Sequence, residues 1–310
     1  MTLIITAVDK GRIIQVSDRR LTWPNGKEHD GNANKAVCVG MGYIHFATSY
    51  TGLAYMAPLE QEESRTDYWL LDALGDITRY GQPRIESICD SLGDRAARTL
   101  SRLAVANKGL TFVMAGYEGD DHRPFRATVS NMKSGGDPSG ARERFVSDVR
   151  RFYPWDPKPD IHIAGAVAAF ESKGSYGRAL KRLRLKVEKH LRKRGEKLNE
   201  LQVAQVLVSL VGAATTHPTY GHLISKNCLS VEAFPPRPGA GAVLSISLDP
   251  PSQSRSDTLF TSHYFSVGAS PVLYGPMIAD PYFNTMSLKI NFDPEIPDEV
   301  REPSEPSEDV

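Results

Sequence analysis

The stretch Thr2-Leu3-Ile4-Ile5-Thr6-Ala7-Val8 determines how the first part of this chain is expected to fold. It is short and largely apolar, and a second β-rich run, Ile13-Ile14-Gln15-Val16-Ser17, follows it. The turn Asp9-Lys10-Gly11-Arg12 separates the two runs and contains a glycine, which adopts positive φ at little cost. The sequence therefore predicts a β-hairpin whose first strand begins at the start of the chain.

Predicted strands and predicted helices follow one another in separate runs along the rest of the chain. Strands are expected over 36–39 and 43–48, and helices over about 66–80 and 84–105, where apolar residues recur every three or four positions. The later elements are expected as strands over 110–117, 125–129 and 161–165, helices over 173–197 and 201–214, and strands over 223–234, 243–248, 258–267 and 287–292. This order predicts an α+β fold, a four-layer αββα sandwich of two antiparallel sheets between helix layers.

The chain is expected to form a single domain over 1–292. Residues 131–159 are rich in glycine, proline and charge, so we interpret them as an inserted loop with one helical turn near 141–150. The strands predicted beyond residue 250 would be extra elements of the same domain. Residues 293–310 contain eight acidic residues, four prolines and one arginine, and this composition predicts a disordered tail.

Composition limits the classes of function. The 310 residues include 37 Lys or Arg and 37 Asp or Glu, so no overall field attracts nucleic acid or an acidic membrane. The three cysteines, Cys38, Cys89 and Cys228, form no C-x-x-C pair, which fits reduced thiols in a cytoplasmic protein. No export signal or membrane span is expected. The common phosphate-loop, zinc-protease and dinucleotide motifs are missing, so neither a metal nor an organic cofactor is expected.

An amphipathic basic helix is predicted over 173–197. This segment contains eleven Lys or Arg residues and two Glu, and Leu180, Leu183, Val187 and Leu191 recur at helical spacing. Its basic face could bind nucleic acid, an anionic lipid or an acidic partner protein. The same pattern is also typical of an exposed helix whose charges are simply solvated.

The first two residues suggest a specific chemistry. If an aminopeptidase removes Met1, Thr2 carries a hydroxyl and a free α-amine, which places a nucleophile and a general base on one residue. Many chains begin with Met-Thr by chance, so this interpretation depends on the remaining sequence.

Several segments in order resemble proteasome β-subunits and related N-terminal nucleophile hydrolases. The strongest similarity lies in Thr2-Leu3-Ile4-Ile5, Gly11-Arg12-Ile13-Ile14-Gln15-Val16-Ser17-Asp18-Arg19-Arg20, Asn34-Lys35-Ala36-Val37-Cys38-Val39 and Ser49-Tyr50-Thr51-Gly52-Leu53-Ala54. Weaker similarity continues at 113–118 and 213–221, so the resemblance covers about residues 2–234.

The resemblance implies a role for four matched residues. Thr2 Oγ1 would attack a carbonyl carbon, and the Thr2 amine would take the hydroxyl proton. Lys35 would lower the pKa of that amine and stabilise developing negative charge, and Asp18 would hold Lys35. The backbone N–H of Gly52 would stabilise the oxyanion. Asp18 and Lys35 could equally form a surface turn pair.

Two segments depart from the family pattern. The family has a Gly-Ser-Gly beside its nucleophile, and this chain has Ala164-Gly165-Ala166 at that place. The family also has an arginine followed by an aspartate, and this chain has His217-Pro218 there. Ala166 and Pro218 thus replace an implied hydroxyl and an implied carboxylate. Polar support could come instead from four residues that could also be purely structural: His217, His222, Thr6 and Ser17.

Two hypotheses about function follow from the sequence. The first is a threonine-type hydrolase of peptide or other amide bonds, with Thr2 as nucleophile. The second is a catalytically inactive proteasome-like subunit that acts as an assembly or binding module, with its basic helix on a partner. Homo-oligomer formation is compatible with both hypotheses.

Overall fold

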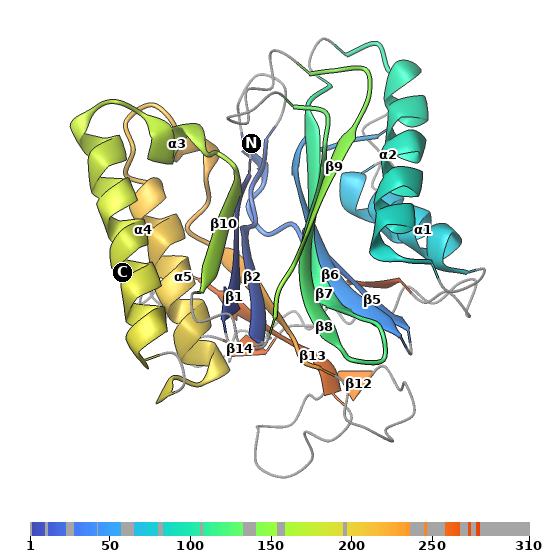
Figure 1. Cartoon of the computed structure of the whole chain (residues 1–310). Helices are drawn as coiled ribbons and strands as arrows, with labels where there is room; N and C mark the ends of the chain where they lie inside the picture. The colour runs from blue at the N-terminus through green and yellow to red at the C-terminus, as the bar shows by residue number, and fades with distance from the viewer. Residues whose placement is uncertain are drawn as a thin grey trace, which may run out of the picture.

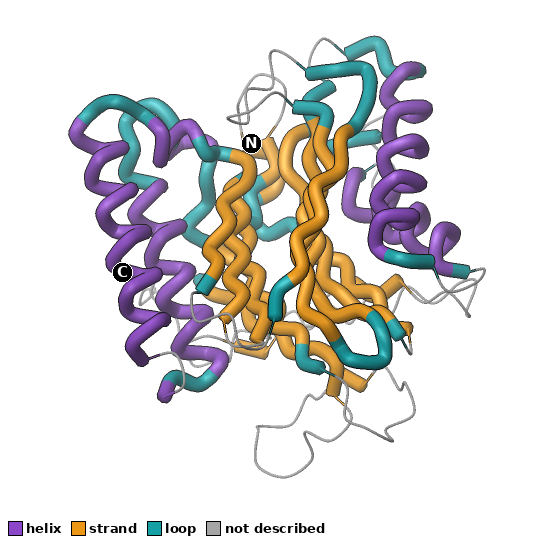
Figure 2. Tube along the Cα trace, viewed as in Figure 1, coloured by secondary structure: helices purple, strands orange, loops and turns teal. Residues whose placement is uncertain are grey.

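The chain folds into two β-sheets stacked face to face, with helices on the outer side of each (Figure 1). The computed structural model describes residues 2–9, 12–22, 28–41, 43–56, 65–79, 83–105, 108–132, 141–153, 159–194, 197–235, 245–246, 258–266, 272–273 and 277–279. Figure 2 shows the strands as two adjacent central layers between helices. The predicted four-layer αββα sandwich is confirmed.

The first sheet contains the N-terminal hairpin. Its order is β10 (Asp160–Gly165), β1 (Leu3–Asp9), β2 (Arg12–Asp18), β11 (Cys228–Ala233), β13 (Thr258–Phe265) and β12 (Ser245–Ile246), with β14 (Val272–Leu273) also paired to β13. Strand β1 is antiparallel to both of its neighbours, so Thr6 lies opposite Gln15 on one side and His162 on the other. The first strand of the chain therefore lies inside the sheet.

The second sheet faces the first and provides the other wall of the interior. Its order is β15 (Met277–Ala279), β5 (Ala36–Met41), β6 (Ile44–Gly52), β7 (Leu110–Glu118), β8 (Arg123–Ser130) and β9 (Val146–Arg151). The pairs from β5 to β9 are antiparallel, whereas β15 pairs with β5, and β12 with β13, in parallel. A separate small sheet pairs β3 (Leu21–Thr22) with β4 (Glu28–Asp30).

Helices cover the outer face of each sheet with apolar side chains. Helices α1 (Thr66–Thr78) and α2 (Ile85–Ser101) cover the second sheet, and α3 (Ala168–Glu171), α4 (Ser175–Arg194) and α5 (Glu200–Ala214) cover the first (Figure 1). The predicted start of α5 is confirmed, because Asn199 and Gln202 form a reciprocal capping box there. Burial of these apolar faces gives each helix layer its own hydrophobic core against its sheet.

The structure corrects two predictions of secondary structure. Residues 141–150 do not form a helical turn: β9 occupies Val146–Arg151 and pairs with β8. Its long-range pairing satisfies the hydrogen-bonding groups of a sheet edge, which local sequence patterns cannot reveal. The strand predicted from residue 223 begins later, because Gly221–Leu223 is a 3₁₀ helix and β11 starts at Cys228. The predictions for 287–292 and 293–310 lie outside the described residues.

The three cysteines are buried free thiols in different parts of the interior. Burial raises the pKa of the Cys89 thiol to about 12, and raises those of Cys38 and Cys228 as well. High thiol pKa values mean little thiolate near neutral pH, and hence little nucleophilic reactivity.

Neither a long apolar helix nor a cluster of potential metal ligands occurs among the described residues. None of the helices in these ranges is both long and apolar enough to cross a membrane. Within the same ranges, no three His, Cys, Asp or Glu side chains are grouped so that they could hold a metal ion.

Candidate active site

Thr2 lies at the N-terminal end of β1, in the interior between the two sheets. It is only 4% exposed. Its carbonyl oxygen accepts hydrogen bonds from the Ala166 nitrogen at 3.1 Å and from Thr51 Oγ1 at 2.9 Å. Ala166 follows β10 in the same sheet and Thr51 belongs to β6 in the facing sheet, so both sheets hold Thr2.

Asp18 ends β2 and is fully buried. Its Oδ2 accepts a hydrogen bond from the Leu3 nitrogen at 2.5 Å, and its Oδ1 accepts from the Arg20 nitrogen at 3.0 Å and the Ser225 nitrogen at 3.4 Å. Lys35 Nζ lies 3.7 Å from Oδ1. These donors fix the carboxylate between the first residues of β1 and the segment before β11.

Lys35 precedes β5 and is also fully buried. Its Nζ donates to Thr2 Oγ1 at 2.5 Å and to the carbonyl oxygen of Arg20. Burial lowers the pKa of Lys35, and the nearby Asp18 carboxylate opposes that shift. A lysine with a lowered pKa can lose its proton more readily, and the hydroxyl of Thr2 is one of the oxygen groups in hydrogen-bond contact with it.

The structure therefore brings three of the four sequence-predicted residues into contact. Thr2, Lys35 and Asp18 form a connected chain of side chains, which excludes the alternative that Asp18 and Lys35 are a surface turn pair. Their catalytic roles stay predictions.

Gly52 ends β6 with a φ of +115°, a conformation that favours glycine. A Cβ atom at this position would lie 2.1 Å from the carbonyl oxygen of Gly109. The glycine is thus required for packing of the backbone. Its role as an oxyanion donor stays a prediction.

Thr51 is the polar residue that the sequence interpretation did not assign to the site. Its Oγ1 accepts a hydrogen bond from the Thr2 nitrogen at 3.0 Å, in addition to donating to the Thr2 carbonyl. The available signal was its position directly before Gly52 in the matched segment. Its contact with Thr2 spans 49 positions in sequence, so no local pattern shows it.

The four residues that the sequence suggested as polar support for Thr2 have other contacts. His217 accepts from the nitrogens of Thr219 and Tyr220 through Nδ1 and contacts Ser172 through Nε2, which gives it a place in the turn after α5. His222 is exposed. Thr6 accepts a hydrogen bond from Gln15 at 3.3 Å, and Ser17 Oγ has no partner among the described residues. None of these four side chains has a hydrogen bond to Thr2 within the described part of the chain.

Gly165 ends β10 with a φ of +86° beside Thr2. A Cβ there would lie 1.7 Å from the Thr2 carbonyl oxygen. We expect Gly165→Ala to destabilise the protein by about 3 kcal/mol or more, because both the clash and the positive φ oppose it. Chemical denaturation measures this free energy of unfolding. The control is Gly212→Ala in α5, where a Cβ meets no atom within 4 Å and should stabilise the helix by about 0.5–1 kcal/mol. Equal stabilities of the two variants would contradict this expectation.

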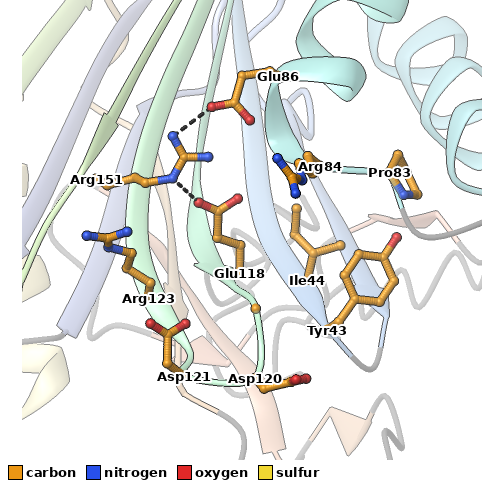
Figure 3. A pocket seen from close by; sticks show the side chains of 11 residues that line it. Tyr43, Ile44, Pro83, Arg84, Glu86, Glu118, Asp120, Asp121, Arg123 and Arg151 are labelled. Carbon is orange, nitrogen blue, oxygen red and sulfur yellow. Dashed lines mark hydrogen bonds and ion pairs between the residues drawn. The ribbon is translucent and has the colours of Figure 1, made fainter.

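One cavity among the described residues adjoins Asp18. A cavity of about 350 Å³ is lined by Arg20, Ser225 and Lys226 among others, and the backbone nitrogens of Arg20 and Ser225 contact Asp18. A larger cavity of about 660 Å³ lies at the other end of β6, beside Ile44. Figure 3 shows Arg151 there between Glu86 and Glu118. The larger cavity therefore contains none of the site residues.

The four-layer sandwich, with Thr2 at the end of an inner strand beside Lys35 and Asp18, is the arrangement that the resemblance to N-terminal nucleophile hydrolases implied. No protein-family model and no curated protein matches the sequence.

Solved structures with a similar fold include Anbu, described as an ancestral β-subunit, from Yersinia bercovieri, and an Anbu Gly-1 mutant from Hyphomicrobium sp. strain MC1. The first has 9% sequence identity and a TM-score of 0.45, over 75% of this chain and 81% of that chain. The second has 12% identity and a TM-score of 0.44, over 74% of this chain and 80% of that chain. These are similarities of structure at low sequence identity.

Proposed function

We propose that this chain is a threonine-type hydrolase of peptide or other amide bonds, with Thr2 as its N-terminal nucleophile once Met1 is removed. The observation that supports the proposal most directly is the 2.5 Å hydrogen bond between Lys35 Nζ and Thr2 Oγ1. A fully buried lysine is costly unless something compensates for it, and here its partners are a hydroxyl, a carbonyl and Asp18. Such a group fits the activation of a nucleophile.

Thr2 Oγ1 attacks the carbonyl carbon of the amide and gives up its proton. Two acceptors are within reach: the free amine of Thr2, whose ordinary pKa is about 7.7–8.0, and the neutral form of Lys35. The charged form of Lys35 also lowers the pKa of the amine by repulsion between like charges. Asp18 holds Lys35 in place through the buried ion pair.

The tetrahedral intermediate carries a negative charge on the former carbonyl oxygen. In the proposed reaction, the N–H of Gly52 donates to this oxyanion. The intermediate then expels the amine product, which takes the proton from the acceptor, and leaves an ester on Thr2. Water hydrolyses that ester, with the same group now acting as general base. The residues involved supply this chemistry without a metal ion.

A catalytically inactive, proteasome-like binding module is the second candidate function. Helix α4 supports it, because the exposed face of this helix carries many basic side chains: Arg178, Lys181, Arg182, Lys186, Lys189, Arg192, Lys193 and Arg194. For such a module, the proposed partner is an acidic protein or another copy of this chain. While Met1 is attached, the Thr2 nitrogen is an amide and cannot act as a base.

The experiment that separates the two functions begins with intact mass. The hydrolase requires a species that lacks Met1, and this species should form an adduct with an amine- and hydroxyl-directed epoxyketone or β-lactone at Thr2. Peptide mapping locates the adduct. A protein that retains Met1 as purified from its own cells, or one that lacks Met1 but forms no adduct and cleaves no amide, supports the binding module and rejects the hydrolase.

A further inference from the structure

Thr51 carries a further inference, which rests on the proposed function. Thr51 lies in β6 of the facing sheet and is fully buried. Its hydroxyl oxygen accepts from the Thr2 nitrogen at 3.0 Å and donates to the Thr2 carbonyl oxygen at 2.9 Å. One side chain therefore binds both polar backbone atoms of the proposed nucleophile.

The direction of these two hydrogen bonds follows from the chemistry of a hydroxyl group, which has one proton and two lone pairs. The Thr2 carbonyl can only accept, so it takes the proton of Thr51. The Thr51 oxygen then faces the Thr2 nitrogen with a lone pair, and that nitrogen must donate. This holds for the amide of the encoded chain and also for the free amine after Met1 is removed.

We propose that Thr51 is a positioning residue that orients the Thr2 amine for proton transfer. A neutral amine has two N–H bonds and one lone pair. When Thr51 accepts one N–H, rotation about the N–Cα bond of Thr2 is restricted, and the lone pair stays free to take the hydroxyl proton. Lys35 Nζ fixes that hydroxyl at 2.5 Å. The two reacting groups of Thr2 are thus held by separate partners, which favours the reactive geometry.

Gly165 provides an independent observation, because its backbone leaves the space that these hydrogen bonds occupy. A Cβ at Gly165 would lie 1.7 Å from the Thr2 carbonyl oxygen and 2.7 Å from Thr51 Oγ1. The segment Ala164-Gly165-Ala166 carries no hydroxyl of its own. Instead, its glycine allows the hydroxyl of Thr51 to approach Thr2 from the facing sheet.

The test compares Thr51→Val, which removes the hydroxyl at nearly constant shape, with Thr51→Ser, which keeps it. All proteins are prepared with Thr2 as their first residue. We expect Thr51→Val to lower kcat about 10- to 100-fold and to change KM less than about twofold, because orientation of a base affects the chemical step. Thr51→Ser should stay within about threefold of the wild type.

The pKa of the Thr2 amine is a second readout, which a merely structural role would not change. An acceptor stabilises the protonated amine, so loss of the Thr51 oxygen should lower this pKa by about one unit or less. The value is read from the rising limb of kcat/KM against pH, and also from NMR titration of protein with ¹⁵N-labelled threonine. A structural role alone would reduce stability in Thr51→Val and leave both the amine pKa and kcat unchanged, which would overturn the proposal.

Thr48→Val is the matched control. Thr48 is another fully buried threonine of β6, and its Oγ1 has no hydrogen-bond partner among the described residues. We expect wild-type kcat and amine pKa in this variant, and an equal loss of kcat in Thr48→Val would overturn the proposal. If the wild type hydrolyses no amide, the proposed function fails by itself. The NMR titration still decides whether Thr51 holds the amine, since it requires no turnover.

Discussion

Replacing Thr2 with alanine is expected to lower amide hydrolysis by at least about 10³-fold, because it removes the hydroxyl on which the proposed ester intermediate forms. Thr2→Ser keeps a hydroxyl beside Lys35 and should retain measurable activity. The rates are measured on one amide substrate at saturation, together with adduct formation by a covalent inhibitor. Only the wild type and Thr2→Ser should form the adduct.

Intact mass must show that the alanine and serine variants have lost Met1 to the same extent as the wild type. Thermal unfolding must show that Thr2→Ala is folded. This is expected because the hydrogen bonds from the Ala166 nitrogen to the Thr2 carbonyl and from the Leu3 nitrogen to Asp18 do not involve the Thr2 side chain. A folded Thr2→Ala protein that hydrolyses the substrate at the wild-type rate would reject Thr2 as the nucleophile.

Replacing Lys35 with methionine is expected to reduce hydrolysis by about 10³-fold and also to destabilise the protein by about 3–5 kcal/mol. The activity falls because Thr2 Oγ1 loses its hydrogen-bond donor and proton acceptor. The stability falls because the Asp18 carboxylate stays buried without its positive partner, both side chains of this pair being 0% exposed. Hydrolysis rates and urea unfolding measure the two effects.

The double variant Asp18→Asn/Lys35→Met separates the two effects. Asparagine removes the unpaired charge, so part of the lost stability should return, by about 1–2 kcal/mol. Activity should not return, because the lysine is still missing. Recovery of hydrolysis in the double variant would show that Lys35 acts only by keeping the protein folded, and would remove it from the mechanism.

The sequence predicted those features that depend on local pattern. The hairpin of β1 and β2 and the helices α1, α2 and α5 all have signals within a few residues of one another, and all are confirmed. Strand β9 was not predicted, because a segment without strand signals separates it from its partner β8. It forms a strand because it pairs with the edge of the sheet at β8. Pairing between distant segments depends on which edges remain uncovered.

The residues of the candidate site also differ in whether the sequence alone could predict them. Asp18 and Lys35 could be proposed because their order and spacing after Thr2 resemble those of a known family, and the structure places them in contact. Thr51 could not be proposed, because its contact with Thr2 depends on how closely two sheets approach. Gly165 contributes to this close approach, because a Cβ atom there would clash with Thr2 and Thr51. In the sequence, the same segment is notable only because it lacks the serine of the related family.

The interior position of the first strand has a practical consequence for how the protein should be produced. Thr2 is buried at the end of β1, and its nitrogen is already directed to Thr51. Any tag or cloning residue left ahead of Thr2 would keep this nitrogen as an amide, which cannot act as a base. Recombinant material with an N-terminal affinity tag would then lack the free amine that the proposed hydrolysis requires, so activity screens require a fusion that is cleaved directly before Thr2.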